Sequence, residues 1–113
     1  MKTRSAKSKG ARLQNMVKAI ILETFPELRP DDVKPAIMGE TGVDIHLSPA
    51  AAELFPFSVE CKNTEKLSIW QAIKQAEQNT KEDTIPLLIF KRNRSEIYAC
   101  ISLKNFVSLL KKN

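Results

Sequence analysis

Two short segments near the middle of the chain alternate apolar and polar residues. Residues 42–47 and 57–63 both show the period of two that is typical of a strand with one buried face. Asp44 lies in the first segment, and Glu60 and Lys62 lie in the second. Because side chains two residues apart leave the same face of a strand, Glu60 and Lys62 should point the same way. If the two strands pair, two carboxylates and an ammonium group come together.

Longer elements are predicted on both sides of these strands. A helix is expected from about residue 9 to residue 25, where Pro26 ends it, because apolar residues recur there at helical spacing: Leu13, Met16, Val17, Ile20, Ile21 and Phe25. Ser68 can cap a second helix that runs to about Asn79. Residues 85–90 are almost uniformly apolar, as in a strand buried on both faces.

The shorter elements complete one α/β domain. Residues 33–38 favour a short strand, and Ser48 followed by Pro49 favours a helical turn. A strand over residues 96–101 and a helix capped by Ser102 close the chain. The order of helix, strands, helix, strands and helix predicts a central mixed sheet flanked by helices.

Composition supports a single folded domain. With 113 residues and 42% hydrophobic content, the chain fits one core, and no apolar run reaches the length of a membrane span. We therefore expect a cytoplasmic protein with no membrane partner. Cys61 and Cys100 are most simply buried thiols, and two cysteines with one histidine are too few for a structural zinc site.

The chain carries a net charge of +5, and its pI is near 9.4. Such a chain suits a polyanionic partner, with nucleic acid first and an acidic membrane surface second. Residues 1–8 are expected to form a basic tail, either solvated or bound to phosphates, and residues 9–113 the domain. A basic turn could contact a nucleic-acid backbone or simply be solvated; it contains Lys91, Arg92 and Arg94.

The central strands also suggest a chemistry. Carboxylates held close together repel each other, and a bound divalent cation relieves that repulsion. The backbone carbonyl of Cys61 could add a further ligand to Asp44 and Glu60, while Lys62 could stabilise the negative charge of a substrate. These residues predict a metal-dependent phosphodiesterase site.

Asp44 followed by Glu60-Cys61-Lys62, with one helix before and one after, resembles the PD-(D/E)XK nuclease superfamily. The resemblance covers about residues 9–101, and the chain is similar to small phage and archaeal Holliday-junction-resolvase-like endonucleases, which share their core with restriction-type endonucleases. It implies an αβββαβ restriction-endonuclease-like core. It also implies that Asp44 and Glu60 bind Mg²⁺ (or Mn²⁺), and that Lys62 orients or activates the attacking water.

The resemblance further implies a DNA endonuclease of the cytoplasm, in a bacterium or a phage-infected cell, that needs no small-molecule cofactor. Its substrate could be branched or structured DNA, and cutting both strands would require a homodimer.

The sequence departs from the family pattern at two places. Val43 stands where the family name has proline. Many members place a glutamate on the first helix, and Gln14 stands here, so that ligand is either neutral or replaced by Glu40. Some members carry a glutamine on the second helix, for which Gln75 is the first choice and Gln71 the second. Arg12 and Gln14 lie off the apolar face of the first helix and are expected to reach DNA.

Other interpretations remain open at this point. A non-catalytic nucleic-acid-binding protein that retains the nuclease fold is favoured by the missing helix glutamate. A membrane or protein-interaction module explains the charge but leaves the central acidic residues without a role. His46 is most simply a strand-surface residue, with a role near substrate as the alternative. Trp70 is expected in the core rather than stacked on a base.

Overall fold

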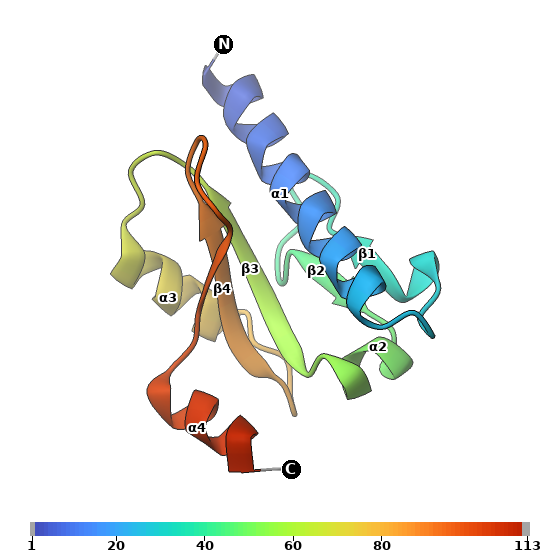
Figure 1. Cartoon of the computed structure of the whole chain (residues 1–113). Helices are drawn as coiled ribbons and strands as arrows, with labels where there is room; N and C mark the ends of the chain where they lie inside the picture. Colours follow the sequence, from blue (N-terminus) through green and yellow to red (C-terminus); the bar gives the residue numbers. More distant parts are fainter. Residues whose placement is uncertain (1, 112–113) are drawn as a thin grey trace.

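The computed structural model describes residues 2–111 (Figure 1). Its helices are α1 (Lys2–Thr24), η1 (Pro30–Asp32, a 3-10 turn), α2 (Pro49–Leu54), α3 (Ile69–Gln78) and α4 (Leu103–Lys111). Its strands are β1 (Val33–Pro35), β2 (Ile45–Leu47), β3 (Phe57–Asn63), β4 (Ile85–Lys91) and β5 (Tyr98–Cys100). With α2 as an insertion, this order contains the αβββαβ arrangement predicted from the sequence.

The central sheet is mixed, as predicted. β3 pairs with β4 in parallel, and β5 pairs with β4 antiparallel. β1 and β2 form a separate antiparallel pair, which reaches the central sheet through a 2.9 Å hydrogen bond from the Asp44 N–H to the Val59 carbonyl.

Helices cover both faces of this sheet (Figure 1). On one face, α1 buries three residues at intervals of four against strand residues that include Val59, Cys61 and Leu87; these three are Leu13, Val17 and Ile21. On the other face, Ala72 and Ala76 of α3 pack on Leu88. The two faces of β3 therefore meet different helices, and Glu60, which is paired in register with Leu88, shares the face of α3.

Several sequence predictions need correction. The first helix begins at Lys2 and not near residue 9, so residues 2–8 continue α1. These residues are mostly good helix formers without proline, which explains the extension. Met16 and Ile20 are partly exposed, because only part of the apolar face of α1 packs against the sheet.

The strand around Asp44 is shorter than predicted and begins at Ile45. Gly42 has φ +98, a left-handed conformation that does not continue a strand. β1 likewise ends at Pro35.

The predicted caps have mixed outcomes. The Ser48 hydroxyl accepts the Ala51 N–H at 3.1 Å, and the Ser102 hydroxyl accepts the Asn105 N–H at 3.2 Å, which confirms both. Ser68 occupies the predicted position but makes no side-chain cap bond. Trp70 was wrongly assigned to the core, since 79% of it is exposed.

Candidate active site

Asp44 is fixed against β3 by hydrogen bonds that lie on either side of Glu60. Its backbone N–H donates to the Val59 carbonyl, and its Oδ2 accepts the Cys61 N–H at 2.7 Å. On the other side, the Asp44 carbonyl accepts the Ala36 N–H at 2.8 Å. The carboxylate is thus placed by backbone groups of β3 and of the segment after β1, which leaves its side chain little freedom to move.

Glu60 and Lys62 leave β3 on the same face, as predicted. The Lys62 Nζ lies 3.7 Å from Glu60 Oε2, and the Glu60 side chain is 5% exposed. The Asn79 Nδ2, just after α3, donates to Glu60 Oε1 at 3.4 Å. Val59 and Cys61 are buried on the opposite face of the strand, so their packing fixes the direction in which Glu60 and Lys62 point.

Burial makes this site unfavourable for negative charge. The pKa of Glu60 is raised by desolvation and then by repulsion from Asp44, while Asn79 and Lys62 act in the opposite direction. The pKa of Asp44 is raised by desolvation, against the Cys61 N–H and Lys62. Burial and both carboxylates also raise the pKa of the Cys61 thiol, which therefore stays protonated. One ammonium group does not fully compensate two carboxylates in this environment.

The donor set fits a hard divalent cation. Mg²⁺ is usually held by one or two carboxylates, with waters and substrate oxygens completing its shell. Asp44 and Glu60 supply two such groups. Among the described residues, no group of three or more His, Cys, Asp and Glu side chains is placed to hold a metal. A site built here would therefore depend on carbonyl, water or substrate oxygens in addition.

Glu40 lies in a different polar contact. Its Oε1 accepts the Ile37 N–H at 2.8 Å, and its Oε2 lies 2.8 Å from His46 Nε2. These contacts lower the pKa of Glu40, with the Ile37 bond as the largest cause. The carboxylate is engaged in holding the turn between β1 and β2, and the described contacts do not bring it to Asp44 or Glu60.

The predicted glutamines are not brought to Glu60 by any described hydrogen bond. Gln14 is half-buried on α1, the helix that covers the opposite face of β3, and Gln71 and Gln75 are exposed on α3. Asn79 is the residue that sequence reasoning missed. It follows Gln75 by four positions, so helical spacing from the predicted glutamine could have identified it.

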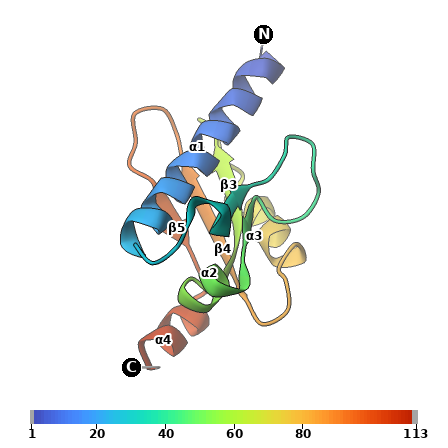
Figure 2. The same ribbon diagram turned by 90° about the vertical axis from the view of Figure 1, so that its right-hand side faces the viewer.

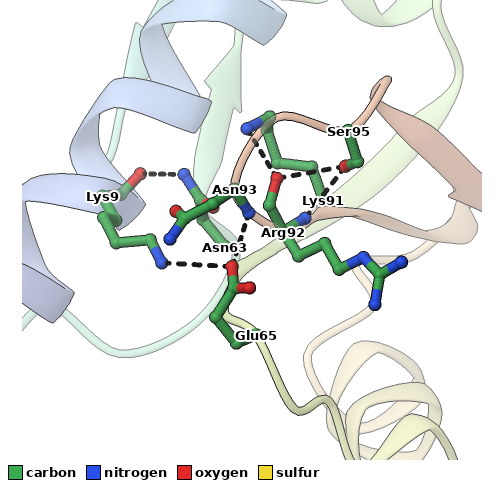
Figure 3. Close-up of polar contacts among 7 residues, drawn as sticks. All are labelled: Lys9, Asn63, Glu65, Lys91, Arg92, Asn93 and Ser95. Carbon is green, nitrogen blue, oxygen red and sulfur yellow. Dashed lines mark hydrogen bonds and ion pairs between the residues drawn. The ribbon is translucent and has the colours of Figure 1, made fainter.

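A polar junction joins α1 to the loop between β4 and β5 (Figure 3). The Asn63 side chain donates to the Lys9 carbonyl at 2.8 Å. Glu65 accepts the Asn93 N–H at 2.5 Å and lies 3.8 Å from the Lys9 Nζ. The Arg92 guanidinium extends away from these contacts in Figure 3, and Arg92 is exposed. The junction therefore holds the basic loop at Asn93 and leaves Arg92 accessible.

A mixed sheet between two helices, with Asp44 held beside Glu60 and Lys62, defines a protein of the PD-(D/E)XK nuclease class. A family model described as "Phage putative PDDEXK endonuclease" matches residues 4–113, and the chain belongs to this family. No curated protein and no solved structure matches the chain. In the described part of the chain, no helix is long and apolar enough to cross a membrane.

Proposed function

We propose that this protein is a metal-dependent DNA endonuclease that hydrolyses phosphodiester bonds. The observation that carries the proposal is the placement of Asp44 by the Cys61 N–H, directly beside the buried Glu60 and its partner Lys62. Membership of an endonuclease family supports the same reaction class.

Each residue has a defined part in this proposal. Asp44, Glu60 and the Cys61 carbonyl would hold Mg²⁺ or Mn²⁺, the hard cations that suit oxygen ligands. When bound, such a cation lowers the pKa of water and withdraws charge from a phosphate. Lys62 keeps an ammonium group next to Glu60, where it can orient the attacking water and stabilise the charge that develops on the phosphate.

Asn79 positions Glu60 in this scheme, through the hydrogen bond to Oε1. It takes the place that the sequence suggested for Gln75. Gln75 would lie near the substrate. Glu40 would become a metal ligand only if the turn between β1 and β2 moves and its contact with His46 breaks.

Basic side chains around the sheet supply the DNA contacts. The net charge of +5 favours a polyanion, and the loop after β4 presents Arg92 and Arg94 to solvent. Lys91 is directed back to the Arg92 carbonyl at 2.9 Å and would need to turn outward to reach a phosphate. Arg12 is exposed on α1 and Gln14 is half-buried near it, and we propose both as further contacts.

The proposed substrate is DNA, including branched or structured forms, and the proposed location is the cytoplasm of a bacterium or a phage-infected cell. The chain carries one Asp44–Glu60–Lys62 set, so cutting both strands requires two copies. The phage endonuclease family supports this setting.

A second function is a DNA-binding protein that keeps the fold without catalysis. Gln14 in place of a helix glutamate favours it. A neutral amide holds a divalent cation more weakly than a carboxylate does.

One experiment separates the two functions. Purified protein is incubated with branched, flapped, single-stranded and linear DNA in Mg²⁺ or Mn²⁺, beside the variants Asp44→Asn and Lys62→Ala. Metal-dependent cleavage by the wild type that is lost in both variants supports the endonuclease. Binding without cleavage on every substrate, in either metal, supports the non-catalytic protein.

A further inference from the structure

The C-terminal helix α4 turns its apolar face to solvent. Four apolar residues lie at helical spacing on one side and are largely exposed: Leu103 (76%), Phe106 (48%), Val107 (50%) and Leu110 (63%). The helix turns a different side toward its own domain, the side that carries the half-buried Asn105 and Leu109. Figure 2 shows α4 projecting at the end of the molecule opposite the N-terminus. A helix of nine residues is marginal in water without tertiary packing, so this face is expected to be covered.

An apolar groove lies beside the same helix. One part has a volume of about 340 Å³ between α3 and β4, and its lining includes Trp70, Ile73, Pro86 and Leu88. A neighbouring part of about 560 Å³ is lined by residues such as Phe90, Tyr98 and Phe106. The two parts share Cys100 and Ile101, so they form one continuous surface.

The size of this surface exceeds what a lone domain normally exposes. Trp70 and Tyr98 are 79% and 57% exposed at the groove. At ~200 Å² for an aromatic side chain, these two and Phe106 leave about 370 Å² in water. Three aliphatic side chains of α4 add to that area. The sum approaches the ~800 Å² that each partner contributes to a standard protein interface, and exceeds the few hundred Å² usual for a monomer.

We propose that a second copy of this chain covers the surface, with α4 of each copy seated in the groove of the other. The chain offers both sides of such a contact: the exposed apolar face of α4, and an apolar groove of which Leu103 and Phe106 of α4 form one wall. A surface that presents both is the condition for a two-fold, self-complementary interface.

The distribution of charge also favours a second copy of this chain as the partner. The charged residues of α4 are Lys104 and Lys111, and the charged residue that lines the first part of the groove is Glu77. In the pair, Glu77 of each copy faces the α4 lysines of the other. This arrangement specifies the homodimer that the proposed function requires, and its link to double-strand cleavage rests on that function.

The first test measures the mass of the full chain without DNA by size-exclusion chromatography with light scattering. We expect a dimer for the wild type and a monomer for Phe106→Asp, since a buried carboxylate cannot replace the apolar contact. The matched control is Ile20→Asp on α1, which is 52% exposed on a different face and should remain dimeric. Circular dichroism spectra verify that both variants are folded.

Trp70 provides an internal reporter, because it is the single tryptophan of the chain. Its emission should move to shorter wavelength as the wild-type concentration rises, and should stay constant for Phe106→Asp. A wild type that is monomeric at all concentrations, or a folded Phe106→Asp that remains dimeric, overturns the proposal.

Charge reversal tests how the helix is seated. Glu77→Lys should raise the dissociation constant of the dimer about tenfold, because it places like charges together, and adding Lys104→Glu should restore affinity. If neither change alters the constant, α4 does not lie in the groove. A wild-type dimer that cleaves no DNA would support this interface and contradict the endonuclease. A wild-type monomer that cleaves DNA would contradict this interface and support the endonuclease.

Discussion

The Asp44 carboxylate accepts the backbone N–H of Cys61 at 2.7 Å. This hydrogen bond fixes the side chain of Asp44 against β3, the strand that also carries Glu60. Glu60 precedes Cys61, so any shift of β3 moves both carboxylates together. The bond also predicts that two substitutions of Asp44 will behave differently.

Asp44→Asn keeps an oxygen that can accept the Cys61 N–H, whereas Asp44→Ala removes the acceptor and leaves a part-buried N–H without its partner. We expect both variants to lose metal-dependent cleavage. Asp44→Ala should also lower the free energy of unfolding by about 1–3 kcal/mol, while Asp44→Asn should stay close to the wild type. Urea unfolding measures the difference, and equal stabilities would show that the bond contributes nothing.

Lys62→Ala removes the ammonium group beside Glu60. Loss of a group that stabilises transition-state charge should reduce the cleavage rate about 10²–10³-fold. The control is Lys66→Ala, an exposed lysine beyond the end of β3 that should cleave within about threefold of the wild type. Initial rates under saturating Mg²⁺ make the comparison. Equal losses in both variants would contradict a specific role for Lys62.

Glu60→Gln should stabilise the metal-free protein at neutral pH. The pKa of Glu60 is raised in the folded state, first by burial and second by Asp44. Its folded form therefore binds more protons than the unfolded form, so stability falls as pH rises from the ordinary glutamate pKa through the raised one. The stability difference between variant and wild type should be small in acid and grow across that window.

Thermal unfolding from acid to neutral pH, without divalent cations, measures this difference. Adding Mg²⁺ should then raise the Tm of the wild type more than that of Glu60→Gln, since the metal relieves a repulsion that the variant lacks. If the wild type is more stable than Glu60→Gln at pH 7 without metal, the raised pKa of Glu60 is refuted.

Asn79→Ala tests the residue that the structure adds to the site. Its hydrogen bond lowers the pKa of Glu60, so its removal should raise that pKa further and move the acidic limb of the pH–rate profile to higher pH. At 3.4 Å the bond is long, so the rate at the optimum should fall less than about tenfold. Gln75→Ala, one helical turn earlier on α3, should leave the acidic limb in place.

Arg94→Gly should have opposite effects on stability and on DNA binding. Arg94 has φ +62, a left-handed conformation that costs a non-glycine residue of order 1 kcal/mol, and glycine relieves it. The same change removes one cation from the exposed loop. We expect a gain in unfolding free energy of up to about 1 kcal/mol, with weaker DNA binding and a shallower salt dependence. Arg92→Gly lacks the positive φ and should weaken binding without stabilising the protein.

Local sequence patterns were sufficient to predict the two strands whose residues alternate in polarity or are uniformly apolar. β3 and β4 agree with the alternation over residues 57–63 and the apolar run over residues 85–90 to within one residue. The prediction that Glu60 and Lys62 share a face followed from the same period of two, and their 3.7 Å contact confirms it.

Other features depend on contacts that no local pattern encodes. Asp44 is held by backbone groups of β3, so its placement does not require a strand at its own position. Trp70 has the spacing of a margin residue on α3, yet within the described chain it remains mostly exposed. Glu40 was a candidate ligand by proximity in sequence, but its pairing with His46 is a property of the turn geometry. The catalytic roles of Asp44, Glu60 and Lys62 remain predictions for the assays above.

The contacts that form the candidate site extend from Ala36 to Asn79 along the chain. The segment after Asn79 reaches this site through the pairing of β4 with β3, while β5 lies one strand farther along the sheet and α4 follows β5 in the chain. The proposed contact surface overlaps this stretch on α3, through Trp70, Ile73 and Glu77, and extends beyond it to α4. If the proposed dimer and the proposed activity both hold, substitutions on α4 alone would convert a dimer that cuts both strands into a monomer that nicks one strand, without altering a residue of the candidate site.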